Sequence, residues 1–125
     1  MNVVDSSAWL EYFADGPNAG YFARAIEDTA GLVVPSLSLY EVYKRITQQR
    51  GENAALQALA VMQQGDVVAL DGPTAISAAR LSLSTKLPMA DSIMLATARR
   101  HEALLWTQDA DFAGMPDVRY RGSRG

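Results

Sequence analysis

The chain has 125 residues, of which 49% are hydrophobic and 20% charged, and its formal net charge is -3 at pH 7. This length predicts a single domain over residues 1–125 with one hydrophobic core. There is no cysteine and only one histidine, His101, which excludes disulfides, zinc-thiolate sites and cysteine nucleophiles and argues against a histidine-based triad. A bound metal would therefore need carboxylate ligands, which favour Mg²⁺, Mn²⁺ or Ca²⁺ over zinc.

The charge of the chain leaves the question of a nucleic-acid partner open. An acidic protein is not an obvious RNA binder, because contacts to phosphate need lysine or arginine. The basic residues are nevertheless clustered in three segments: Lys44, Arg45 and Arg50; Arg99 and Arg100; Arg119, Arg121 and Arg124. Such clusters are also common on ordinary solvated surfaces, so both interpretations stand.

We expect a cytoplasmic protein without a membrane partner. The first residues show no basic segment followed by an apolar run, so no signal peptide is expected. No apolar stretch approaches the ~18 residues of a membrane-spanning helix.

Short apolar segments alternate with helical segments along the chain. Strands are predicted at residues 2–4, 32–34, 67–70, 104–106 and 118–120. Helices are predicted at residues 8–14, 18–30, 36 or 38 to 50, 53–64, 74–85 and 90–102. Residues 107–114 should form a loop with at most one helical turn, and residues 122–125 a frayed tail. The alternation predicts an α/β fold, a three-layer sandwich with a central, mostly parallel sheet of four to five strands flanked by helices.

Acidic residues follow two of the predicted strands. In open α/β sheets, ligands bind beyond the carboxyl ends of the strands. Asp5 follows the first strand, and Asp109 and Asp111 follow the fourth. If these strands are neighbours, they lie ~4.8 Å apart, and their trailing carboxylates would converge within reach of one metal ion.

Two further acids, Glu41 and Asp91, lie in the first turns of predicted helices. Helix N-termini in this architecture point to the same edge as the carboxyl ends of the strands, so these acids can join Asp5 and Asp109 there. Carboxylates brought together raise one another's pKa. A divalent cation removes that conflict, which is the physical reason to expect a metal site.

Each acid also has a simpler structural interpretation. Asp5 could open a turn, Glu41 could pair with Arg45 along a helix, and Asp91 could interact with the helix dipole. The aspartates after the fourth strand could be ordinary loop residues. Only the joint placement at one edge favours a site.

Four segments of the sequence resemble the motifs of PIN domains. The segment Val-Val-Asp-Ser-Ser-Ala-Trp-Leu at residues 3–10 resembles their opening strand, which ends in Asp followed by Ser or Thr. Ser-Leu-Tyr-Glu-Val at 38–42 is similar to the helix that carries their Glu, and 87–98 to their Ala-Asp helix. Residues 104–112 resemble their Thr-x-Asp-x-Asp-Phe loop. The order and spread of these segments, and the short chain, resemble VapC-type toxins in particular.

This resemblance implies a Mg²⁺-dependent endoribonuclease, with Mn²⁺ as a substitute, that acts as the toxin of a type II toxin–antitoxin pair. It implies an RNA substrate, a VapB-type antitoxin and a homodimer. Carried over by position, the catalytic and metal-binding acids are Asp5, Glu41, Asp91 and Asp109. Ser7 and Thr107 match supporting hydroxyls. Asp111 is ambiguous: it could bind metal, replace Asp109, or cap the following turn.

The predicted mechanism is metal-assisted hydrolysis of a phosphodiester bond, with one or two ions activating a water for in-line attack. Asp91 or Asp109 could accept the proton of that water, whereas His101 is expected to lie away from the site. An α/β phosphoacceptor domain is an alternative, but neither Lys44 nor Lys86 follows a late strand. A haloacid-dehalogenase-type phosphatase would need an acid where Ser7 stands. A catalytically silent, dimeric PIN-like interaction module is the non-enzymatic alternative.

Overall fold

The computed structural model describes residues 1–123, which contain all the predicted strands and helices. The strands are β1 (Asn2–Val4), β2 (Leu32–Pro35), β3 (Asp66–Val68), β4 (Leu104–Thr107) and β5 (Val118–Tyr120). The helices are α1 (Ser6–Phe13), α2 (Ala19–Ile26), α3 (Ser36–Arg50), α4 (Glu52–Met62), α5 (Gly72–Thr85) and α6 (Met89–Arg100), with short 3₁₀ turns η1 (Thr29–Gly31) and η2 (Ala110–Phe112).

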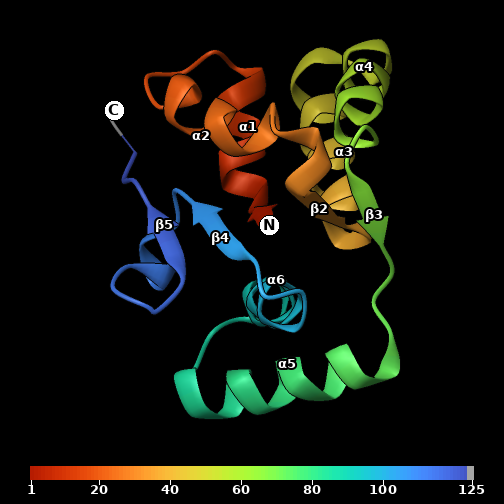
Figure 1. The fold of residues 1–125 in the computed structure, drawn as a ribbon. Helices are drawn as coiled ribbons and strands as arrows, with labels where there is room; N and C mark the ends of the chain where they lie inside the picture. The colour runs from red at the N-terminus through yellow and green to blue at the C-terminus, as the bar shows by residue number, and fades with distance from the viewer. Residues whose placement is uncertain (124–125) are drawn as a thin grey trace.

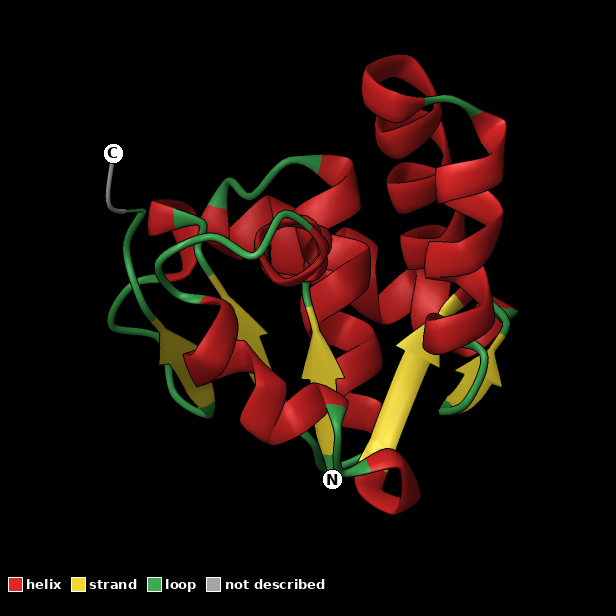
Figure 2. Cartoon of the chain, turned by 90° about the horizontal axis from the view of Figure 1, so that it is seen from above, coloured by secondary structure: helices red, strands yellow, loops and turns green. Residues whose placement is uncertain are grey.

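All five strands form one parallel sheet in the order β3-β2-β1-β4-β5. Helices α1 to α4 lie on one face, and α6 covers the other with α5 packed outside it (Figure 1). The arrowheads of the strands point toward the same edge of the sheet (Figure 2). The predicted three-layer α/β sandwich is therefore confirmed, and the sheet is entirely parallel.

The strands alternate between the two faces, as the period of a strand requires. Val3 and Leu105 pack with α6, whereas Val4 and Trp106 pack with the α1–α4 layer. Because both faces are covered by helices, these strands consist of consecutive apolar residues instead of alternating polar and apolar ones.

Two predicted boundaries were wrong. The helix predicted for residues 18–30 ends at Ile26, and the amide of Gly31 closes a 3₁₀ turn on the carbonyl of Asp28, 3.1 Å away. The strand predicted for residues 67–70 is β3, Asp66–Val68, which pairs with β2 only as far as Pro35. Beyond Pro35 the chain of β2 becomes α3, so Ala69 and Leu70, which follow β3, have no strand to pair with and are exposed.

The predicted frayed tail is also wrong at its first residue. The carbonyl of Gly122 accepts a hydrogen bond of 2.9 Å from the side-chain amide of Asn18, so the chain is still tied to the body there. Residues 124–125 of that predicted tail lie outside the described residues. Among the helices of residues 1–123, none combines the length and apolar character needed to cross a bilayer.

Candidate active site at the carboxyl edge of the sheet

The strands that precede Asp5 and Asp109 are neighbours, as the sequence-based argument required. Val4 of β1 pairs with Trp106 of β4. The amide of Asp5 donates to the carbonyl of Trp106 over 2.8 Å, which continues the pairing past the end of β1. Asp5 and the loop after β4 therefore leave the sheet side by side.

Asp5 is a buried carboxylate held by two hydroxyl groups. Its Oδ2 atom accepts hydrogen bonds from Ser7 Oγ at 2.8 Å and from Thr107 Oγ1 at 2.9 Å. Burial raises the pKa of Asp5, the hydrogen bonds from Ser7 and Thr107 lower it, and the charge of Glu41 adds a smaller increase. The hydroxyls predicted as supporting groups thus contact Asp5 directly and fix its orientation.

The same hydroxyls also hold the loop that follows β4. The amide of Gln108 donates to Ser7 Oγ at 3.1 Å, and the amide of Asp109 donates to Thr107 Oγ1 at 2.9 Å. Thr107 is fully buried, so its hydroxyl is shared between Asp5 and Asp109 without competition from water. This arrangement couples the position of one predicted acid to that of another.

Asp91, Asp109 and Asp111 form the tightest group of acids among the described residues. One carboxylate oxygen from each lies within 4.8 Å of the others. Asp91 belongs to the first turn of α6. Its pKa is raised to about 7, first by burial and then by the charges of Asp109 and Asp5. This cluster is where mutual repulsion of carboxylates is largest.

Asp109, and not Asp111, caps the turn that follows β4. Asp109 is the N-cap of η2, and its Oδ1 accepts the amide of Asp111 at 2.9 Å. The alternative that Asp111 caps this turn is wrong, because η2 begins at Ala110, two residues earlier than a cap at Asp111 requires. Asp111 is exposed but directs a carboxylate oxygen at the cluster. Phe112 is fully buried and anchors the loop in the core.

Glu41 stands apart from this group of three aspartates. Its Oε1 accepts a hydrogen bond of 2.6 Å from Ser6 Oγ, and its charge acts on Asp5. The structure therefore brings Asp91 and Asp109 together with Asp111, and connects Glu41 to them through Asp5. The role of Ser6 was missed. The sequence signal was the pair of consecutive serines that follows Asp5. In the structure, Ser6 donates to Glu41 and Ser7 donates to Asp5.

The donor set suits a hard divalent cation. The cluster offers carboxylate oxygens only, which are the ligands that Mg²⁺ and Mn²⁺ prefer. The pKa of Asp91 is raised first by burial and then by the charges of Asp109 and Asp5, and a bound cation would offset both effects. Hydrogen-bonded hydroxyls behind the acids, such as Thr107 on Asp5, are the supporting arrangement typical of metal sites.

The chain matches the family model of the PIN domain over residues 3–118. It belongs to the PIN domain family. This family assignment removes the phosphoacceptor and haloacid-dehalogenase-type alternatives. The chain has no significant match among curated protein sequences.

Several solved structures share the fold of this PIN domain. A toxin–antitoxin complex from Klebsiella pneumoniae has a TM-score of 0.81 at 21% identity and covers 94% of this chain and 95% of that one. The VapC20 toxin of Mycobacterium tuberculosis, described as cleaving the sarcin–ricin loop, has a TM-score of 0.78 at 17% identity, with coverages of 95% and 98%. DNA-bound VapBC from Salmonella typhimurium has a TM-score of 0.75 at 12% identity, with coverages of 98% and 97%. The fold is thus that of VapC-type toxins.

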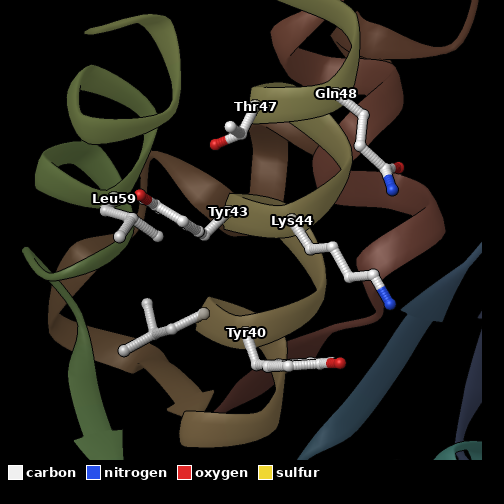
Figure 3. A pocket seen from close by; sticks show the side chains of 7 residues that line it. Tyr40, Tyr43, Lys44, Thr47, Gln48 and Leu59 are labelled. Carbon is white, nitrogen blue, oxygen red and sulfur yellow. The ribbon is translucent and has the colours of Figure 1, made fainter. Parts of the chain in front are cut away.

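An apolar hollow of about 600 Å³ lies on the surface of this PIN domain, away from the acid cluster. Its lining residues come from α3 and α4: Leu39, Tyr40, Tyr43, Lys44, Thr47, Gln48 and Leu59. Tyr40, Lys44 and Gln48 extend from one side of α3, whereas Tyr43 and Thr47 lie on the side toward α4 (Figure 3). The hollow contains none of the predicted catalytic acids, although Glu41 belongs to the same helix.

Proposed function

We propose that this PIN domain is a metal-dependent endoribonuclease that acts as the toxin of a type II toxin–antitoxin pair. The observation that carries the proposal is the convergence of Asp91, Asp109 and Asp111 within 4.8 Å at the edge where Asp5 is held by two hydroxyls. Family membership supports hydrolysis of nucleic acid, and the similar structures described as toxins support the biological role. RNA and an antitoxin are cytoplasmic molecules, which is where this function would place the chain.

In the proposed mechanism, Mg²⁺ would be held by four acids, Asp5, Asp91, Asp109 and Glu41, and Mn²⁺ could substitute for it. The ion would lower the pKa of a water molecule and neutralise charge on the phosphate oxygens. Asp111 joins this set because its carboxylate faces Asp91 and Asp109. Ser7 and Thr107 position Asp5, and the buried Thr107 keeps the backbone of Asp109 in place. A carboxylate of the cluster that is free of metal would accept the proton of the attacking water.

The function is tested by incubating the purified protein with total cellular RNA in the presence of Mg²⁺, Mn²⁺ or EDTA. We expect discrete cleavage fragments with either metal and none with EDTA. The matched control is Asp91→Asn, which keeps the size of the side chain and removes its charge. Cleavage of equal extent by folded Asp91→Asn would show that the activity does not arise at this site.

We further propose a homodimer and a VapB-type antitoxin as protein partners. The outer side of α5 leaves Ile76 and Leu83 exposed, at 57% and 77%, and Met89 at the start of α6 is 75% exposed. Exposed apolar residues gathered on one side are typical of protein interfaces. The apolar hollow between α3 and α4 offers a second surface of this kind, and Glu41 belongs to α3 as well.

The homodimer is tested by measuring the mass of wild type and of Leu83→Lys by light scattering at micromolar concentrations. We expect a dimer for wild type and a monomer of unchanged circular dichroism for the variant. A wild-type monomer across this range would refute the dimer. The antitoxin is tested by searching the neighbouring reading frames for a small protein and co-expressing it with this chain. Suppression of the expected growth arrest would support the proposal, and arrest at the same level would contradict it.

A further inference from the structure

The segment that follows β5 brings two arginines onto one tyrosine of α2. The guanidinium carbon of Arg121 lies 4.0 Å from the centre of the Tyr21 ring. That of Arg24 lies 5.8 Å from the same ring and 5.8 Å from the ring of Trp106. Both arginines are exposed. Two positive charges are therefore collected around one aromatic side chain, with their guanidinium groups open to a ligand.

A third arginine belongs to the same surface because of the register of β5. Arg119 pairs with Trp106 in the parallel sheet, and paired residues of neighbouring strands point to the same face. Arg121 follows two positions later and so shares that face. Arg119 is also exposed. We call Arg24, Arg119 and Arg121 the arginine patch.

The arginine patch reaches the edge of the sheet that carries the acids through Arg121. The amide of Arg121 donates to the carbonyl of Thr107 at 3.0 Å, and the Thr107 hydroxyl donates to Asp5. Thr107 points toward the acids, whereas Trp106, one residue earlier, points toward the patch. In the ribbon, the chain beyond β5 runs up toward α2, next to the end of β4 (Figure 1). A strand of nucleic acid lying across this edge would meet both surfaces.

Buried Asn18 fixes the patch relative to the catalytic loop. Asn18 is 1% exposed, and its Nδ2 donates to Gln108 Oε1 at 2.7 Å and to the carbonyl of Gly122 at 2.9 Å. Gln108 precedes Asp109, and Gly122 follows Arg121. One side chain therefore ties the arginine-bearing segment to the acid-bearing loop, so the distance between patch and site is held by the fold.

We propose that the arginine patch binds the phosphate backbone of single-stranded RNA next to the phosphodiester bond that is cut, an inference that rests on the proposed function. A protein of net charge -3 with clustered carboxylates repels RNA, and cations beside the site offset that repulsion. The guanidinium group matches phosphate in geometry and keeps its charge at every physiological pH. The aromatic rings of Tyr21 and Trp106 hold the guanidinium groups of Arg24 and Arg121 in place without neutralising them.

The test measures the affinity for a short fluorescein-labelled oligouridine by anisotropy, in EDTA so that no cleavage occurs, over a range of salt concentrations. We compare wild type with the double variant Arg24→Gln/Arg121→Gln and with Arg80→Gln, an exposed arginine of α5 that serves as the matched control. The double variant should bind about fivefold to thirtyfold more weakly at low salt. The slope of log affinity against log salt should fall by about 0.7 for each phosphate that the variant no longer neutralises.

Two further variants separate phosphate binding from a structural role. Arg121→Lys keeps the charge and should keep most of the salt slope. Arg119→Gln removes the charge of a patch residue that does not stack on Tyr21. It should therefore lower the salt slope without a change of melting temperature. The proposal would be overturned if the salt slopes of Arg119→Gln and of the double variant equalled that of wild type. It would also be overturned if these variants no longer bound a protein partner but still bound RNA as wild type does.

Failure of the patch and failure of the proposed function give different results. A wild-type protein that cleaves RNA, with variants of unaltered salt slope, would overturn the patch alone. A wild-type protein that binds oligouridine through the patch but cuts no RNA with Mg²⁺ would overturn the nuclease and support the patch. A wild type without either property would overturn both.

Discussion

The centre of the sheet and its β3 side differ in which side chains they bury: polar side chains are buried at the centre, and apolar side chains are exposed on the β3 side. Between β1 and β4, the polar side chains of Asp5 and Thr107 are buried and hydrogen-bonded. Around β3 and α5, the apolar side chains of Leu70, Ile76 and Leu83 are exposed. Burying a carboxylate is costly unless its partners are arranged for it. The first region therefore supports the proposed active site, and the second supports the proposed interface with another protein.

The largest expected effect lies in the central region. Asp91→Asn removes a carboxylate that lies within 4.8 Å of those of Asp109 and Asp111. It should lower the rate of RNA cleavage by about a hundredfold to a thousandfold, the loss typical of removing one electrostatic contact to a reacting phosphate or oxyanion. Single-turnover cleavage of total RNA measures it. Leu83→Lys, in the β3–α5 region, should retain far more activity. If the two variants lose equal activity, the division between the two regions is wrong.

Asp109 and Asp111 divide the central region more finely. Asparagine at position 109 can still accept the amide of Asp111, so Asp109→Asn preserves the cap of η2 and removes only the charge. We expect Asp109→Asn to reduce cleavage by about a hundredfold and Asp111→Asn, at the exposed end of the cluster, by about tenfold. Cleavage rates and Mn²⁺ affinities of both variants decide it. The opposite order would make Asp111 the main ligand of the pair.

The buried hydroxyl of Thr107 is expected to have the next largest effect. Thr107→Val keeps the shape of the side chain but leaves Asp5 without one donor and the amide of Asp109 without its acceptor. We expect metal affinity to fall about tenfold to a hundredfold and the free energy of unfolding to fall by about 1–3 kcal/mol. Thr97→Val is the matched control, because that buried hydroxyl only bonds the carbonyl of Ile93 in its own helix. Equal metal affinity in the two variants would contradict the role of Thr107.

The sequence was informative about the central region because Asp5 and Asp109 follow apolar segments and Asp91 lies in the first turn of a helix. The apolar run before Asp5 and the one before Thr107 predicted two strands, and the parallel architecture then required their ends to meet. The β3 side was less predictable. Whether Leu70 belongs to a strand depends on how far β2 extends, and β2 stops at Pro35 because α3 begins there. Local hydrophobicity does not contain that information.

Two features of the site also depended on backbone geometry that residue types do not specify. Asp109 caps η2 because η2 begins at Ala110. The sequence alone does not distinguish Asp109 from Asp111 for this role. The arginine patch requires the register that pairs Arg119 with Trp106, and the packing that brings Arg121 over Tyr21. Clustered arginines near the end of the chain were visible in the sequence, but their common face was not.

The smallest expected effect is on stability, and it arises from the raised pKa of Asp91. The pKa is 3.8 in the unfolded reference and about 7 in the folded protein. The folded state therefore binds more protons between these values, and the contribution of Asp91 to stability is largest below the lower one and is lost as pH rises toward the higher one. Without metal, wild type should have a lower melting temperature at about pH 8 than at about pH 5.

Asp91→Asn carries no titrating group at this position, so its melting temperature should fall less over the same interval. Divalent metal should reverse the difference, because binding to the folded state alone adds stability that grows with the ratio of concentration to Kd. Mn²⁺ at the higher pH should thus raise the melting temperature of wild type by several degrees and that of Asp91→Asn by less. Thermal melts of both proteins in EDTA and in Mn²⁺ test this. Parallel pH dependences in EDTA would mean that burial and the neighbouring carboxylates do not raise the pKa of Asp91, and the electrostatic case for a cation there would fail.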